Sequence, residues 1–134
     1  MDLKELESIS SELGILLKDK NYFFTTAESC TGGWVGQSLT SVPGSSKAFF
    51  LGLITYSNQS KIKLLKVPKK ILLKHGSVSK ETCISMLKNL NKLSKTYVSI
   101  SITGIAGPSG GTVKKPVGLV FIGLKIGFKR IRIN

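Results

Sequence analysis

Segments with helical periodicity alternate with β-prone segments along this chain, and this alternation limits its possible folds more than any other feature. Leucine and isoleucine recur at helical spacing over residues 3–20, and residues 22–27 are rich in phenylalanine and threonine. The same criteria predict further helices over 34–42, 57–66 and 68–74, a helix that begins at Ser79 with an apolar stripe from Cys83 to Leu93, and strands over 48–56 and 97–102. Strands that alternate with helices predict an α/β layered domain.

The last part of the chain predicts an antiparallel pair of strands. Residues 117–125 and 128–133 are β-prone and flank Gly127, so we expect a hairpin that makes the sheet mixed. The preceding loop, 103–116, contains four glycines and two prolines and is long for a simple connection. A chain of 134 residues has the length of one domain, so we expect residues 1–134 to form a single domain.

The charge is strongly positive and unevenly distributed. The net charge is +13, residues 1–30 are acidic, and 18 of the 20 basic residues are lysines. Such a field attracts polyanions and phosphorylated small molecules alike. The lysines are scattered, however, and the aromatic residues do not interleave with them as a base-stacking surface requires. We therefore favour compositional drift over nucleic-acid binding as the origin of the charge.

Cysteine content and hydropathy indicate the class of protein. Cys30 and Cys83 are the only cysteines, too few for a disulfide framework or a cysteine metal cluster. The apolar stretches 48–56 and 117–124 are far shorter than the roughly 20 residues of a membrane helix. The acidic N-terminus does not have the chemistry of a signal peptide. We expect a cytoplasmic protein with reduced thiols, no membrane partner and no metal site.

Three segments are candidates for chemistry. The turn Glu28-Ser29-Cys30-Thr31-Gly32-Gly33 lies between an expected strand and an expected helix, where backbone N–H groups are unpaired and Ser29 has the position of a nucleophile. An ordinary capped turn explains the same spacing. The segment 55–61 leaves the second strand and contains Lys61, and the glycine-rich loop 103–111 follows the third strand. The sole histidine, His75, precedes a glycine at an expected helix end, which favours a capping role.

Together these segments form a recognisable series. In its order and spacing the series resembles the CinA C-terminal domain family, and it comprises Ala27–Gly33, Val42–Ser46, Thr55–Asn58 with Lys61, His75–Ser79, Thr103–Pro108 and Lys115–Gly118. The resemblance covers nearly the whole chain. It implies a three-layer α/β/α sandwich on a mixed β-sheet. Stand-alone members of that family are nicotinamide mononucleotide deamidases, so it also implies hydrolysis of the carboxamide of this pyridine mononucleotide to nicotinate mononucleotide and ammonia, without cofactor or metal.

The resemblance also implies roles for individual residues. Ser29 is expected to be the nucleophile and Lys61 its base, with Tyr56 beside them. The residues expected to hold the substrate are Thr31, Gly32, Gly33, Thr103, Gly104, Ile105, Ala106 and Gly107. N–H groups near Gly32 and Gly33 are expected to stabilise the oxyanion. Only about 1 in 2,500 free lysines is neutral at pH 7, so a basic Lys61 requires burial beside Ser29.

The chain departs from the family at its C-terminal end. Family members continue into a segment with a helix and an arginine thought to face the substrate, whereas this sequence stops at Asn134. Without that helix we expect an exposed sheet face, a homo-oligomer, or an inactive remnant. The rival functions are therefore a nucleotide-binding or scaffold protein without turnover and, from the charge, a nucleic-acid binder with steep salt dependence.

Overall fold

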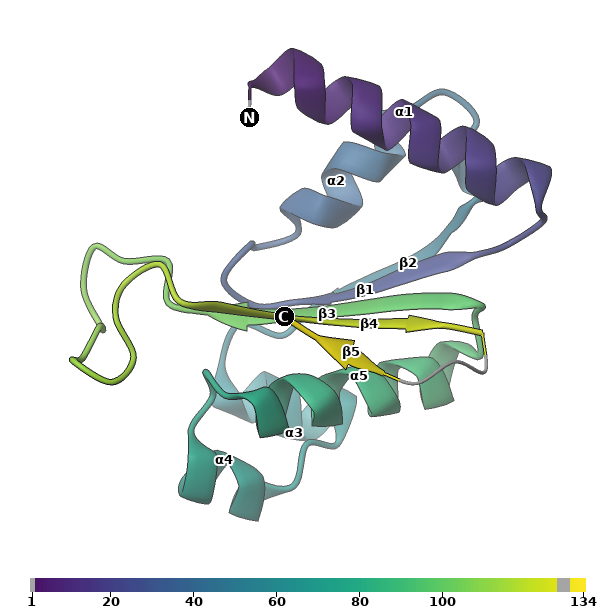
Figure 1. Ribbon diagram of the computed structural model, residues 1–134. Helices are drawn as coiled ribbons and strands as arrows, with labels where there is room; N and C mark the ends of the chain where they lie inside the picture. Colours follow the sequence, from purple (N-terminus) through teal and green to yellow (C-terminus); the bar gives the residue numbers. More distant parts are fainter. Residues whose placement is uncertain (1, 128–130) are drawn as a thin grey trace.

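A mixed β-sheet with helices on both faces forms the fold, as Figure 1 shows for the computed structural model, which describes residues 2–127 and 131–134. The elements in chain order are α1 (Leu3–Asp19), β1 (Phe24–Glu28), α2 (Trp34–Thr40), η1 (Ser45–Lys47), β2 (Phe49–Ile54), α3 (Asn58–Leu65), α4 (Lys69–His75), α5 (Lys80–Ser94), β3 (Val98–Gly104), β4 (Val120–Ile126) and β5 (Arg132–Ile133). Helices α1 and α2 lie on one face of the sheet, and α3, α4 and α5 lie on the other. The expected three-layer α/β/α sandwich is confirmed.

The sheet order is β2-β1-β3-β4-β5. Strand β1 pairs in parallel with both β2 and β3, whereas β3 with β4 and β4 with β5 pair antiparallel. Every residue of β1 is buried, because the strand is central and both its faces are covered. The sheet is therefore mixed, as the sequence predicts.

Side-chain caps fix where three of the helices begin. Asp2 accepts a hydrogen bond from the Glu5 N–H at the start of α1, and Ser57 and Ser60 form a reciprocal capping box at the start of α3. Ser79 accepts from the Thr82 N–H and opens α5, as predicted. Each such cap is worth about 1 kcal/mol and, more importantly here, fixes the register of the residues that follow.

The main apolar core lies between the sheet and the helices α3, α4 and α5. Cys83, Met86, Leu87 and Leu90 of the α5 stripe are fully buried, at about 1.5–3 kcal/mol for each large apolar side chain. Leu93, which the helical spacing places on the same stripe, is instead 59 % exposed because it lies in the last turn of α5. The cluster comprises Ala27, Leu65, Val67, Leu72, Met86 and Leu90.

The opposite face of the sheet is covered less completely. A smaller cluster around Leu17, Phe24 and Leu39 holds α1 and α2 to the sheet. Beside it runs an apolar groove of about 780 Å³, which the α1 stripe lines together with Ile100 of β3 and Leu124 of β4. Part of this sheet face is therefore open in the described structure.

The predicted strands have slightly different limits in the structure, and the two in the last part of the chain show the reason most clearly. The strand expected over 117–125 begins only at Val120, because the Gly118 N–H donates to Ile105 O and the Leu119 N–H donates to Pro116 O, which folds residues 116–119 into a turn. The strand expected over 128–133 includes residues 128–130, which lie outside the described residues, and Arg132–Ile133 pairs with β4. Among the described residues, no helix combines the length and hydropathy that crossing a membrane requires.

Candidate active site

The candidate site lies where the three parallel strands end. Strand β2 lies next to β1 on one side, and β3 lies next to β1 on the other side. The connection from β1 to β2 contains α2 on one face of the sheet, and the connection from β2 to β3 contains α3, α4 and α5 on the opposite face, so the two connections diverge at the carboxyl end of β1 (Figure 1). In open α/β sheets this switch point leaves a crevice in which ligands bind. The segments after Glu28, Ile54 and Gly104 all leave the sheet at this edge, at the left-hand end of the strands in Figure 1.

Ser29 is held at the first residue after β1. Its N–H donates to Ile102 O at 3.0 Å, and its carbonyl accepts from the Gly32 N–H at 3.0 Å. Gly32 and Gly33 both adopt positive φ, which glycine reaches without strain and which allows the tight turn into α2. A side chain on Gly33 would also bring its Cβ within 2.7 Å of Ile54 Cδ1. The turn therefore fixes Ser29 through the backbone, with the side chain 7 % exposed.

Glu28 ties the same turn to the helix that follows it. The side chain is 1 % exposed, and its two carboxylate oxygens accept hydrogen bonds from the N–H groups of Val35 and Gly36, each at 3.0 Å. A side chain on Gly36 would bring its Cβ within 3.5 Å of that carboxylate. The buried carboxylate satisfies N–H groups that would otherwise lack partners at the start of α2.

Lys61 reaches Ser29 from the first turn of α3. The side chain is 1 % exposed, and its Nζ donates to Ser29 Oγ at 2.9 Å and to Thr55 O at 2.7 Å. Tyr56 O lies at 3.5 Å from the same Nζ. Among the described residues, Lys61 is the hydrogen-bond partner of the Ser29 hydroxyl. In the structure Lys61 is buried beside Ser29, as the sequence analysis expects.

The electrostatics of the pair follow from its burial. Desolvation lowers the pKa of Lys61, because the charged ammonium loses water that its carbonyl and hydroxyl partners only partly replace, and the nearby Cys30 thiol opposes this shift. Burial raises the pKa of the Cys30 thiol, which therefore stays protonated and a weak nucleophile. Of the two neighbouring side chains, Ser29 is the one that accepts a hydrogen bond from Lys61 Nζ.

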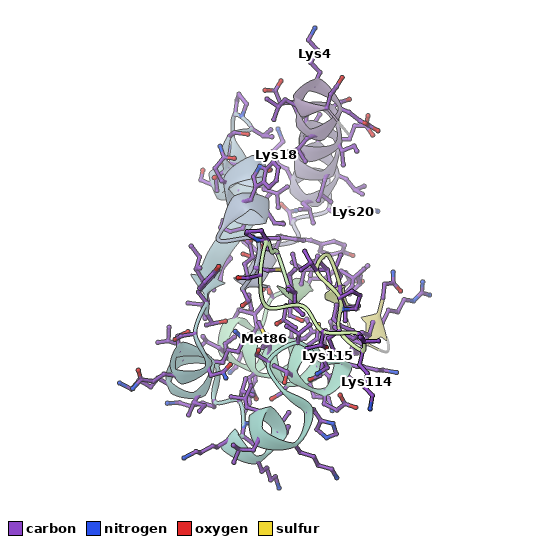
Figure 2. The ribbon with its side chains drawn as sticks, turned by 90° about the vertical axis from the view of Figure 1, so that its left-hand side faces the viewer. Lys4, Lys18, Lys20, Met86, Lys114 and Lys115 are labelled. Atoms are coloured by element: carbon purple, nitrogen blue, oxygen red, sulfur yellow. The ribbon has the colours of Figure 1, made fainter. Side chains whose placement is uncertain are left out.

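A cleft of about 480 Å³ lies near the pair: neither Ser29 nor Lys61 lines it, but its lining includes Tyr56, whose carbonyl oxygen is 3.5 Å from Lys61 Nζ. Tyr56 and Gly104 connect it to Ser29 and Lys61, since Tyr56 follows Thr55 and a Cβ on Gly104 would lie 3.0 Å from Cys30 Sγ. The Tyr56 side chain is 69 % exposed. Figure 2 looks onto the loop between β3 and β4, part of which forms one wall of the cleft. The lining residues are Tyr56, Gly76, Ser77, Val78, Gly104, Ile105, Ala106, Gly107, Ser109, Gly110, Thr112 and Lys115.

Not all residues expected to hold substrate face this cleft. Gly104 to Gly107 line it, whereas Thr103 is 1 % exposed and its hydroxyl donates to Ser77 O at 2.7 Å. Thr31 lines the apolar groove on the other face of the sheet, and its buried Oγ1 has no hydrogen-bond partner among the described residues. The Gly32 N–H is used within the turn, while the N–H groups of Thr31 and Gly33 donate to no carbonyl in the described part of the chain.

Comparison with known proteins identifies the family. The sequence model of the CinA C-terminal domain matches residues 6–132, almost the full chain. The chain belongs to the CinA C-terminal domain family. A CinA-like protein of Kosmotoga olearia is 48 % identical over 123 residues, which are 92 % of this chain and 30 % of the relative. The chain thus spans about three tenths of the length of the curated relatives it matches.

Solved CinA structures share the fold. The competence/damage inducible protein CihA from Agrobacterium tumefaciens matches with a TM-score of 0.93 and 33 % identity over 96 % of this chain and 78 % of that one. A CinA-superfamily protein from Escherichia coli matches with a TM-score of 0.90 and 30 % identity, over 100 % of this chain and 78 % of that one. The mixed sheet and its two helical layers are therefore the CinA architecture.

Several residues of the candidate site carry no role in the sequence-based prediction. Glu28, the Thr55 carbonyl and Lys115 are examples, and Glu28 and Lys115 stand within the motif series that resembles the family. An acidic residue before a Gly-Gly turn that opens a helix was a signal for the capping role of Glu28. Over the described residues, no group of three or more histidine, cysteine or acidic side chains is arranged to hold a metal ion.

Proposed function

We propose that this chain hydrolyses the carboxamide of nicotinamide mononucleotide, with Ser29 as nucleophile and Lys61 as general base. The observation that supports the proposal best is the 2.9 Å contact between Lys61 Nζ and Ser29 Oγ, both nearly buried, with the pKa of Lys61 lowered by desolvation. A serine hydroxyl is a weak nucleophile until an adjacent base removes its proton. The identity of the substrate comes from the resemblance to stand-alone members of the family.

In the first half of the reaction, neutral Lys61 takes the proton of the Ser29 hydroxyl as Oγ bonds to the carboxamide carbon. The carbonyl oxygen becomes an oxyanion. The C–N bond then breaks, and the Lys61 ammonium returns the proton to the departing nitrogen, so that ammonia leaves and an ester on Ser29 remains.

In the second half, water replaces ammonia. Lys61, neutral again, takes a proton from the water as its oxygen bonds to the ester carbon. The ester C–O bond breaks, and Ser29 Oγ recovers the proton from Lys61. The products are nicotinate mononucleotide and ammonia, and the protein returns to its starting state, so no redox partner or metal is needed for the balance.

The turn is suited to stabilise the oxyanion. The N–H groups of Thr31 and Gly33 follow the nucleophile closely and donate to no carbonyl among the described residues. Donors of this kind contribute about 2.7–4 kcal/mol each to transition-state stabilisation in acyl transfer. Tyr56 and the segment Gly104–Gly107 line the cleft near the pair, and the Thr103 hydroxyl holds the neighbouring Ser77 backbone.

The test is ammonia release from nicotinamide mononucleotide by the native protein, with Ser29→Ala and Lys61→Ala beside it and nicotinate mononucleotide identified as the second product. The proposal predicts turnover by the native protein and its loss in both variants. Folded native protein that binds the nucleotide without turnover would replace the proposal by a nucleotide-binding remnant. Binding that depends steeply on salt and shows no preference for mononucleotides would favour a nucleic-acid function.

A further inference from the structure

The cleft near Ser29 has a wall whose residues take no part in the bond-making and bond-breaking steps of the proposed reaction. Three segments meet there: residues 76–78 after α4, residues 104–107 after β3, and residues 109–115 of the loop that leads toward β4. The hydroxyl of Thr103 holds the first two together by donating to Ser77 O at 2.7 Å. The wall is therefore a fixed part of the site, built from backbone and small side chains.

Among the described residues that line this cleft, Lys115 carries the only formal charge. The remaining lining residues are glycine, serine, threonine, tyrosine and small apolar side chains. Lys115 is half-buried, so water screens its ammonium less than it screens an exposed lysine. The cleft thus presents one isolated positive group, which suits a ligand with one anionic group.

The position of that ammonium is fixed. Lys115 Nζ donates to His75 O at 2.6 Å, its backbone N–H donates to Thr112 Oγ1 at 3.0 Å, and the Thr112 N–H donates to Lys115 O at 2.7 Å. An ammonium carries three protons, so two remain for a ligand. Gly76 leaves room next to it, since a Cβ at that position would lie 3.3 Å from Nζ.

We propose that Lys115 forms a phosphate-monoester subsite in this cleft and thereby selects a mononucleotide over the corresponding nucleoside. The inference rests on the proposed function, because it assumes that the reacting end of the substrate lies at Ser29. The phosphate then lies at the far wall, beside the Lys115 ammonium and the hydroxyl-bearing residues Ser77 and Thr112. Lysine binds phosphate as a point charge with several donors.

Lys115 also has a purely structural interpretation, as a clip between the loop and the end of α4. The two roles differ in what they predict for a pair of ligands that differ only in the phosphate. If Lys115 only holds the loop in place, it contributes equally to the binding affinity of both ligands. If it forms a phosphate subsite, it contributes only to the affinity of the phosphorylated ligand. Lys114 is the matched control, because it is exposed, lies next to Lys115 in the same loop, and carries the same charge (Figure 2).

The experiment is isothermal titration calorimetry with nicotinate mononucleotide and nicotinate riboside, which the proposed reaction does not consume. It compares the native chain with Lys115→Met, Lys115→Arg and Lys114→Met. The native chain is expected to bind the mononucleotide more tightly, and Lys115→Met is expected to reduce the ratio of the two affinities about ten- to hundredfold. Lys115→Arg, which retains the charge, and Lys114→Met are expected to preserve most of that ratio.

An unchanged ratio in Lys115→Met would overturn the proposal, as would an equal loss of affinity for both ligands, which indicates a clip. A native chain that does not prefer the mononucleotide overturns it too. The ammonia assay is read separately: if turnover is absent but the ratio depends on Lys115, the subsite stands and the amidase function fails. If turnover is present but the ratio is independent of Lys115, the reverse holds.

Discussion

Lys61→Met removes the proposed base while filling most of its volume. Lys61 is 1 % exposed, and its Nζ is the hydrogen-bond partner of Ser29 Oγ, so no other side chain among the described residues is placed to replace it. General-base catalysis contributes about 10²- to 10⁴-fold. At 1.36 kcal/mol for each factor of ten, kcat/KM is expected to fall by an amount equivalent to about 2.7–5.5 kcal/mol.

Two further variants test whether the effect comes from the basicity of Lys61, from its positive charge, or from the loss of any lysine in α3. Lys61→Arg retains the positive charge, but a guanidinium does not lose its proton in proteins and therefore cannot act as a base. Its kcat/KM is expected to fall as far as that of Lys61→Met. Lys63→Met removes an exposed lysine from the same helix and is expected to change kcat/KM less than twofold. Native activity in Lys61→Arg would refute the role of Lys61 as a base.

Stability is measured on the same proteins, because Lys61→Met also leaves the Ser29 hydroxyl and the Thr55 carbonyl without their donor. Each buried polar group that loses its partner costs about 1–3 kcal/mol, while removal of the buried ammonium offsets part of that cost. Urea unfolding of each variant shows whether the chain is folded under assay conditions. If a variant is fully folded under assay conditions, its loss of kcat/KM reflects a loss of catalysis and not of folded protein.

Three further predictions concern pH and the residues around the pair. The proposed base acts as the neutral amine and burial lowers the pKa of Lys61 below the ordinary 10.5, so kcat/KM is expected to rise with pH and reach a plateau below that value; a profile that falls with pH would contradict this. Glu28→Gln replaces one carboxylate oxygen by an NH₂ group that faces a backbone N–H, so the free energy of unfolding in urea is expected to fall by about 2 kcal/mol. An unchanged free energy of unfolding would show that the contacts of Glu28 to α2 contribute nothing to stability. Gly104→Ala places a Cβ 2.7 Å from Leu119 O, so the free energy of unfolding is expected to fall by about 1–3 kcal/mol, and kcat/KM is expected to fall with it. An unchanged free energy of unfolding would show that the backbone of β3 and of the segment before β4 can move apart without cost.

The sequence predicts the elements well because their apolar periodicities are regular, as for α5 and its buried stripe from Cys83 to Leu90. It predicts the ends of elements less well where tertiary hydrogen bonds decide, as for Val117, which the turn before β4 removes from the expected strand. Leu93 fits the stripe but is exposed because it lies in the last turn of α5, and helical spacing does not show how far along a helix its apolar stripe stays buried.

The site could be anticipated only as a combination of motifs. Ser29 and Lys61 are 32 positions apart, and spacing alone does not distinguish Lys61 from 17 other lysines; the family resemblance selects it, and burial in the fold distinguishes it. The hydroxyl of Thr103 illustrates the reverse case, since its position in a glycine-rich motif does not show that it binds Ser77 O. Contacts of this kind depend on strand register and loop packing, which local sequence does not encode.

Mass spectrometry of the protein during turnover would detect the covalent ester that the proposed mechanism places on Ser29. The native chain is mixed with nicotinamide mononucleotide, quenched in acid and digested, with Ser29→Ala and Cys30→Ala treated in parallel. A nicotinate mononucleotide ester on Ser29 is expected in the native and Cys30→Ala proteins, and neither ester nor ammonia release is expected in Ser29→Ala. Ammonia release by Ser29→Ala at the native rate, or an acyl group on Cys30, would contradict the proposed mechanism.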